Sequence, residues 1–201
     1  MTFIELGSGS PDLSYRQRAS HVIALAFAVF ALVIGYNLRN TGLFSTTRYE
    51  NVEAGIRAEY PRNWLFDNQG DYVFRVRNMT RVGFKTTIQV ELRPVGAAGS
   101  TRSILDAISL ERFQSLAAYQ VINVDASTPL ADDIESVTMA YTYADTDRDP
   151  FLQSIPTVVR GVDILAVRGG QVVIITFLAD ATTFESDYAF FERFLSGLEF
   201  R

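Results

Sequence analysis

The chain has 201 residues, of which 18 are basic and 23 acidic, and its formal net charge at pH 7 is −5. This acidic excess argues against nucleic acid as the main partner, because binding to phosphates needs clustered Lys and Arg. The chain contains no cysteine and one histidine, which excludes disulfides, thiol catalysis and thiolate metal sites.

Residues 19–38 form an uncharged and mainly apolar stretch near the N-terminus. A helix of this length is roughly 30 Å long, which matches the hydrocarbon core of a bilayer. The apolar run is longer than that of a signal peptide and ends without a clear cleavage site. We therefore expect an uncleaved transmembrane helix that contacts the lipid bilayer directly.

The charges on the two sides of this span predict its orientation. Arg16 and Arg18 stand just before it, and an acidic domain follows it. By the positive-inside rule, residues 1–18 form a flexible cytoplasmic tail in a single-pass protein of the cell membrane. Residues 39–48 are then a short connector, and residues 49–201 form one domain on the extracytoplasmic (periplasmic) side.

The single histidine, His21, lies at the edge of the predicted span. Ionisable groups inside a membrane are functional candidates, although one near the headgroups can remain neutral at little cost. We expect an ordinary interfacial residue. The alternative is that His21 contacts a pigment, haem or quinone between helices, and no cofactor is predicted otherwise.

The first half of the domain shows strand periodicity followed by a helix. A strand is expected over residues 52–60, ended by a proline. Residues 72–77 and 86–92 alternate apolar and polar side chains, which predicts two neighbouring antiparallel strands. A helix capped at residue 100 or 101 should run to about residue 118. Its apolar side chains are Ile104, Leu105, Ile108, Phe113 and Leu116.

The second half is expected to contain strands, a hairpin and a final helix. Further strands are predicted over residues 120–126 and 134–143, and Gly169-Gly170 should form the two-residue turn of a hairpin. Thr182 and Glu185 have the spacing of a capping box before a helix that ends at Gly197. A short last strand follows. This order predicts an α+β domain in which helices cover an antiparallel sheet.

Residues 55–64, Gly-Ile-Arg-Ala-Glu-Tyr-Pro-Arg-Asn-Trp, are similar to the opening strand and Tyr-Pro-x-x-Trp turn of the PsbP-like (Mog/PsbP) family. The hairpin, the capped helix and residues 195–200 then follow in the family's order. The resemblance implies an α-β-α sandwich over residues 49–201. Because the family's members are mostly extrinsic subunits of photosynthetic complexes, small lipoproteins and interaction modules, it also implies an accessory part that is not an enzyme. The membrane helix distinguishes this chain from the photosynthetic members.

The sequence offers few groups for catalysis or metal binding. Without cysteine, and with its histidine in the span, the domain cannot assemble a Cys-His or Ser-His-Asp nucleophile. Asp145, Asp147 and Asp149 have the opening spacing of a calcium loop, but Pro150 and Pro156 stand where that loop needs Gly and Glu. We expect an ordinary acidic loop, with a weak cation site as the alternative.

The same loop carries apolar residues that are candidates for a partner contact, namely Phe151, Leu152 and Ile155. Trp64 is a further candidate, although its turn also suits packing over the end of the sheet. We expect a non-catalytic accessory or assembly subunit that binds other membrane-protein subunits. By resemblance, the host is a photosynthetic or respiratory electron-transfer complex. The alternative is a free-standing extracytoplasmic domain that binds a small ligand or a cation.

Overall fold

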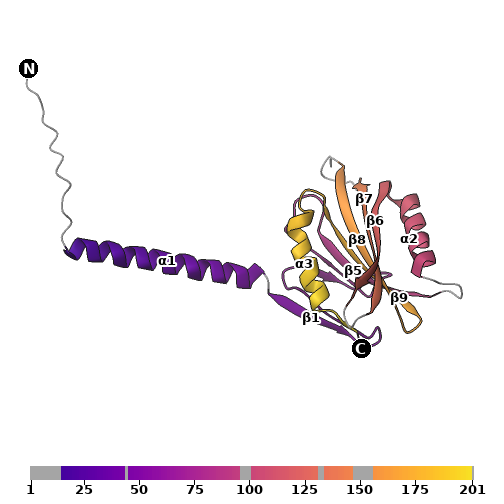
Figure 1. Cartoon of the computed structure of the whole chain (residues 1–201), viewed down its shortest axis with the longest axis horizontal. Coiled ribbons are helices and arrows are strands. Elements are labelled where there is room, and N and C mark those ends of the chain that lie inside the picture. Colours follow the sequence, from indigo (N-terminus) through magenta and orange to yellow (C-terminus); the bar gives the residue numbers. More distant parts are fainter. Residues whose placement is uncertain (1–14, 44, 96–100, 131–133, 147–155, 201) are drawn as a thin grey trace, which may run out of the picture. The chain divides into compact units, whose positions relative to one another are not determined.

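The computed structural model describes residues 15–43, 45–95, 101–130, 134–146 and 156–200 (Figure 1). The chain divides into two compact units, Met1–Phe44 and Ser45–Arg201. In the first unit, helix α1 (Tyr15–Leu43) contains an apolar segment, Arg18–Arg39, of 22 residues that are not buried. A helix of 22 residues is about 33 Å long, so α1 is long and apolar enough to span a membrane.

The segment 39–48, expected to be a connector, is divided between two elements. Helix α1 continues to Leu43, and strand β1 (Thr46–Asn51) begins soon after it. Strand β1 was not predicted because its alternation separates exposed from half-buried side chains and contains a single large apolar residue, Tyr49. The domain therefore begins with a strand before the expected one.

The remaining elements all belong to the second unit. In chain order they are β2 (Ile56–Pro61), β3 (Leu65–Asp67), β4 (Phe74–Arg77), β5 (Thr87–Pro94), α2 (Thr101–Ser115), β6 (Ala117–Pro129), β7 (Glu135–Asp145), β8 (Thr157–Arg168), β9 (Gln171–Asp180), α3 (Phe184–Ser196) and β10 (Glu199–Phe200).

The strands form two antiparallel sheets. One has the order β1-β2-β10, and the other has the order β3-β4-β5-β9-β8-β7-β6. The predicted pairing of β4 with β5 is confirmed, with Phe74 opposite Val90. The predicted hairpin is confirmed as well, since Gly169 and Gly170 have φ angles of 56° and 77° between β8 and β9. Positive φ at both positions is what a type I′ turn requires.

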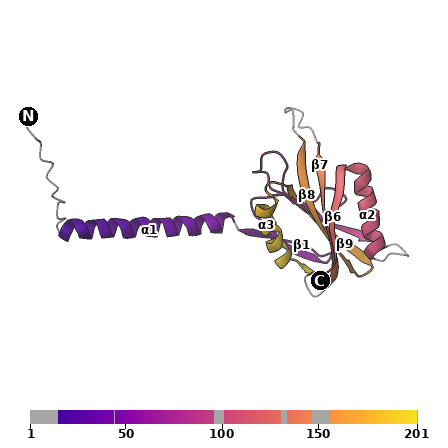
Figure 2. The same cartoon turned by 45° about the horizontal axis from the view of Figure 1, so that its top comes forward.

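The two faces of the seven-stranded sheet carry different cores. Ile164 on β8 belongs to the core of one face, whereas its neighbour Leu165 belongs to the core of the other. This alternation follows from the two-residue period of a strand. Figures 1 and 2 show α3 and α2 on opposite sides of the sheet. The domain is therefore the α+β sandwich that the sequence predicted.

The α3 face holds the larger core and is rich in aromatic residues. Phe177 on β9 stacks on Phe191 of α3 with ring centroids 4.9 Å apart. The three-stranded sheet contributes Ile56 and Phe200 to the same core. On the other face, α2 buries only Leu105 and Ile108. Because this second core is smaller, the attachment of α2 to the sheet depends more on polar contacts than that of α3 does.

Two predictions about the helices are wrong in detail. Thr182 does not cap α3, because its hydroxyl donates to Asp180 at 2.7 Å, and the N-cap residue is Thr183, which makes no side-chain cap bond. Phe113, one of the apolar side chains expected to carry the packing of this helix, is 69% exposed. It follows Ile108 by five residues, which turns it about 140° away around the helix.

Candidate functional site

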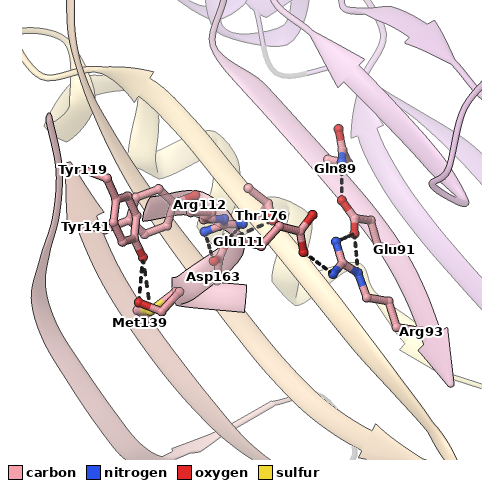
Figure 3. Close-up of polar contacts among 11 residues, drawn as sticks. Gln89, Glu91, Arg93, Glu111, Arg112, Tyr119, Met139, Tyr141, Asp163 and Thr176 are labelled. Carbon is pink, nitrogen blue, oxygen red and sulfur yellow. Dashed lines mark hydrogen bonds and ion pairs between the residues drawn. The ribbon is translucent and has the colours of Figure 1, made fainter. Parts of the chain in front are cut away.

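A buried ion pair joins α2 to the sheet. Arg112 lies in the last turn of α2, and Asp163 lies in the middle of β8 with no exposed surface. The guanidinium group donates to both carboxylate oxygens, and the Nη2–Oδ1 distance is 3.0 Å. The hydroxyl of Thr176 on β9 donates to Oδ1 at 2.8 Å. Figure 3 shows these groups converging between the helix and the strands.

Tyr141 on β7 completes this buried cluster. Its hydroxyl donates to Oδ1 of Asp163 at 3.4 Å, and its ring lies 4.4 Å from the guanidinium carbon of Arg112. The ring therefore supports the cation as well as the carboxylate. Tyr141 is 1% exposed, so water has almost no access to this side of the ion pair.

Burial controls the ionisation of the cluster. It raises the pKa of Asp163, and the lowering by Arg112 and Thr176 offsets this only in part. Burial alone would lower the pKa of Arg112, but Asp163 and Tyr141 more than compensate, and the pKa lies above its ordinary value. Burial and Asp163 also raise the pKa of Tyr141 well above that of a free phenol. Tyr141 is therefore a neutral hydrogen-bond donor at physiological pH.

A second polar group lies beside the first, at the surface of β5. Arg93 donates to Glu91 at 3.0 and 3.1 Å and to Glu111 of α2 at 2.8 Å. Gln89 donates to Glu91 at 2.5 Å. Because Glu111 and Arg112 are consecutive, the exposed and the buried ion pairs hold the same turn of α2 (Figure 3).

A groove of about 240 Å³ lies between this turn of α2 and the sheet. Both clusters contribute to its lining, together with Tyr143, Leu116 and Leu178. Pockets for small molecules usually measure about 300–1,000 Å³, so this groove is below the usual range. Its charged residues, Glu91, Arg93, Glu111 and Arg112, are already paired with one another or with Asp163.

The arrangement is suited to holding α2 on the sheet. The buried carboxylate accepts hydrogen bonds from three side chains, and the domain has neither histidine nor cysteine to act beside it. Among the described residues, no group of three His, Cys, Asp or Glu side chains could hold a metal ion. The site is therefore a structural clamp between helix and sheet.

The predicted site residues lie elsewhere. His21 is exposed on α1, and Asp145 is the half-buried last residue of β7. Trp64 is 4% exposed and packs against Phe190 of α3 with ring centroids 5.7 Å apart. This burial contradicts its prediction as a partner contact, because the turn folds the indole into the core. The other candidates, Asp147, Asp149, Phe151, Leu152 and Ile155, lie outside the described residues.

The Asp163 cluster was not predicted, although the sequence contains one sign of it. Asp163 interrupts the apolar run Val162–Val167 in a strand that is buried on both faces. A charge in such a strand requires a partner. Its partner Arg112 is 51 residues away in sequence and could not be identified from spacing.

Neither a protein-family model nor a curated protein sequence matches this chain. The structure is similar to cyanobacterial PsbP (CyanoP) from Synechocystis sp. PCC 6803, with 13% identity and a TM-score of 0.58 over 80% of this chain and 95% of that one. It is also similar to LpqN, a Mycobacterium tuberculosis protein involved in cell envelope biogenesis, with 12% identity and a TM-score of 0.52 over 77% and 89% of the two chains.

The Saccharomyces cerevisiae Ran-binding protein Mog1p matches with 11% identity and a TM-score of 0.48, over 78% of this chain and 95% of that one. The two similarities with the higher scores, to CyanoP and LpqN, show that the domain has the PsbP-like fold.

Proposed function

We propose that this chain is a non-catalytic accessory or assembly subunit of a larger membrane complex, anchored by α1. The observation that carries the proposal is that the buried carboxylate of the candidate site is bonded to neighbouring side chains of the domain. Asp163, the only carboxylate in the candidate site with no exposed surface, is fully engaged by neighbouring side chains. Together with the apolar helix α1 and the PsbP-like fold, this supports a role in binding partners rather than in chemistry.

A second buried carboxylate supports the same conclusion. Asp187 of α3 has no exposed surface and accepts hydrogen bonds from Arg81 and, at 2.6 Å, from Thr86. These bonds fix the segment between β4 and β5 to α3. Removing one partner of a buried ion pair is strongly destabilising, so such pairs contribute to a defined structure. Neither Asp163 nor Asp187 is left available for a substrate.

The position of the domain and the kind of host are further parts of this proposal. Arg16 and Arg18 before the apolar span favour a cytoplasmic N-terminus, which places the domain outside the cytoplasm. The partners are then other membrane-protein subunits. We propose a photosynthetic or respiratory electron-transfer complex as the host, by the family resemblance. His21 is proposed as an ordinary interfacial residue, with contact to a pigment, haem or quinone between helices as the alternative.

Copurification tests the proposal. The tagged full chain is extracted from its native membrane in a mild detergent, and the recovered proteins are identified and quantified. We expect other membrane-protein subunits in a fixed ratio to the chain. As a control, a chain in which an unrelated apolar helix replaces α1 separates binding through the anchor from binding through the domain. Recovery of the chain without any other membrane protein would contradict the proposal.

Labelling tests the orientation. The chain has no cysteine, so Val82→Cys introduces a single thiol at a side chain that is 98% exposed. We expect a membrane-impermeant maleimide to label this thiol in cells whose outer envelope layers are permeabilised while the cytoplasmic membrane stays intact. Labelling only after the cytoplasmic membrane is disrupted would place the domain in the cytoplasm and contradict this part of the proposal.

A further inference from the structure

The chain between α1 and the domain is very short. The apolar segment ends at Arg39, α1 continues to Leu43, and β1 begins at Thr46. Four helical residues rise about 6 Å, and the two residues before β1 cover at most about 7 Å when extended. The headgroup layer on each side of a bilayer is itself about 5–8 Å thick. When α1 spans the bilayer, the start of β1 therefore lies close to the headgroups, whatever direction the domain takes from there.

Backbone contacts bring one end of the domain to this point. The N–H of Arg62 donates to the carbonyl of Ser45 at 2.9 Å, so the turn that follows β2 lies beside the start of β1. Strand β3 then begins at Leu65, which pairs with Arg77 at the end of the antiparallel β4. The loop of residues 78–86 leaves β4 directly after Arg77, at the same end of the pair. Both connections therefore leave the sheets at the end of the domain where β1 begins.

This end of the domain is basic, although the domain as a whole is acidic. Residues 49–201 include 14 basic and 21 acidic residues. Residues 61–65 and 77–86 include four basic and no acidic residues, and we call these two segments the basic end. Its basic residues are Arg62, Arg77, Arg81 and Lys85.

Three of these four charges have no carboxylate partner among the described residues. Arg81 forms an ion pair with the buried Asp187 of α3. The Lys85 ammonium donates to the backbone carbonyl of Arg81, which leaves its charge uncompensated. Arg62 and Arg77 form no ion pair within the part of the chain that the structure describes, and Arg62 is exposed. The basic end therefore suits an anionic partner.

The opposite end of β1 and β2 carries the other sign of charge. Glu50 and Glu53 lie at the end of β1 and in the turn after it, and Glu199 of β10 lies in register with Arg57 of β2. Arg57 is the basic residue there and forms ion pairs with both Glu50 and Glu199. An anionic surface attracts the basic end and repels this acidic end, so charge alone favours one orientation of the domain.

The basic end also exposes apolar side chains. Val82 is 98% exposed beside Gly83, whose φ angle of 76° turns the loop, and Leu65 and Met79 are 46% and 48% exposed. Protein surfaces that lie on a bilayer combine cations with apolar side chains that enter the boundary between headgroups and acyl chains. Both components are present at this end of the domain.

We infer that the basic end docks on the anionic headgroups of the bilayer that holds α1. Arg62, Arg77 and Lys85 then lie near lipid phosphates, and Val82 lies among the headgroups. The inference rests on the proposed anchoring by α1. Lipid is favoured over an acidic protein because the short covalent link to α1 brings the lipid itself within reach of this end.

Docking holds the domain in one orientation, with its acidic end away from the lipid and open to partner subunits. Salt should weaken the docking, because it screens the attraction between cations and phosphates over a Debye length of about 10 Å at 0.1 M. Because the headgroup layer is hydrated, a thiol at residue 82 stays accessible to the maleimide of the orientation test.

Fluorescence quenching tests the inference, because each introduced cysteine is the only one in the chain. Val82→Cys and, as the matched control, Val52→Cys in the β1–β2 turn replace valines that are 98% and 87% exposed. Each full chain carries one fluorophore and is reconstituted into vesicles whose lipids bear a quencher just below the headgroups. We expect strong quenching at residue 82 and weak quenching at residue 52 when the vesicles contain phosphatidylglycerol. In vesicles of phosphatidylcholine alone, the two positions should be quenched to a similar extent.

Removal of charge supplies the second measurement. Arg62→Gln/Lys85→Gln, in the Val82→Cys chain, should reduce the ratio of docked to undocked domain about fivefold for each lost charge. The matched control is Arg102→Gln/Arg168→Gln, which removes two cations at the opposite end of the seven-stranded sheet and should leave the ratio nearly unchanged. Urea denaturation in detergent checks that both double variants remain folded.

The outcomes separate this inference from the proposed anchoring. Release of the chain from the vesicles by an alkaline wash would overturn the anchoring, and the docking with it. Retention of the chain with equal quenching at residues 52 and 82 in anionic vesicles, or with quenching that does not depend on phosphatidylglycerol, would overturn the docking alone. The vesicles contain no host subunit and no acidic partner protein, so neither result depends on the copurification experiment.

Discussion

Tyr141 on β7 and Gly161 on β8 are direct cross-strand partners, and the tyrosine ring fills the space that a β-carbon at residue 161 would occupy. This placement brings the phenol hydroxyl to Asp163 and the ring face to Arg112. Gly161 is therefore required by packing, whereas the glycines of the β8–β9 turn are required by their positive φ angles.

Gly161→Ala should force the Tyr141 ring away from the ion pair. We expect the free energy of unfolding of the full chain in detergent to fall by about 1–3 kcal/mol, the usual cost of overpacking, as measured by urea denaturation. In a Tyr141→Ala background the same substitution should cost little, because the ring is gone. An equal cost in both backgrounds would show that the ring is not what excludes the β-carbon.

Loss of Arg112 should destabilise the domain far more than loss of Arg93. Arg112→Leu leaves the buried Asp163 carboxylate without its cation and should lower the free energy of unfolding by about 3–5 kcal/mol. Arg93→Leu breaks ion pairs with partly exposed groups, including Glu111, and should cost less than about 1 kcal/mol.

Urea denaturation of both variants, together with the double variant Arg112→Leu/Asp163→Leu, checks this prediction. The double variant removes both charges and should recover much of the loss. If it is as unstable as Arg112→Leu alone, packing of the arginine side chain matters more than its charge.

The stability contributed by Asp67 should depend on pH in acid solution. Hydrogen bonds from Tyr72, from the backbone N–H of Gln69 and from Arg75 lower the pKa of this carboxyl in the folded domain. The unfolded chain therefore binds the proton more readily. This contribution is fully present above the unfolded pKa of about 3.9 and is lost as the pH falls further toward the folded pKa.

The comparison is between the melting temperatures of the parent chain and Asp67→Asn over a range of pH. We expect the variant to melt at a lower temperature at neutral pH, and the difference to narrow below about pH 4. Tyr72→Phe removes the largest cause of the shift and should weaken the pH dependence. A difference that is constant down to pH 2 would contradict the assigned cause.

Ala118→Gly should stabilise the domain. Ala118, the second residue of β6, has a φ angle of 51°, in the left-handed region that costs residues with a β-carbon about 1 kcal/mol or more. We expect a gain of about 0.5–1 kcal/mol in urea denaturation. The control is Ala107→Gly on the exposed side of α2, which should lose about 1 kcal/mol. A loss in both variants would show that residue 118 is not strained.

Features fixed by neighbouring residues could be predicted from the sequence. The turn at Gly169-Gly170 depends on two glycines and the apolar runs beside them, and the structure confirms it. The periodicity of β4 likewise places Phe74 and Val76 in the core, as expected. The overall fold followed because such local features occur in an order that one layered arrangement satisfies.

Features that depend on distant residues could not be predicted. The Arg112 and Asp163 pair joins a helix to a strand that enters the sheet much later in the chain, so spacing carried no sign of it. The capping box failed for a more local reason. The Thr182 hydroxyl donates to Asp180, whereas in a capping box it would accept a hydrogen bond from a backbone N–H of the helix, and the sequence pattern does not show which of the two bonds forms.

The three-stranded sheet joins the beginning of the domain to its end. Glu199 of β10 binds Arg57 of β2 across 142 residues, and Phe200 closes the core beside it. The residues of β10 are thus needed to finish a sheet whose other two strands come at the start of the domain. A nascent chain must keep β2 without one of its partner strands until β10 has been synthesised, and such high contact order slows folding. A chaperone or the translocation machinery has that interval in which to act on it.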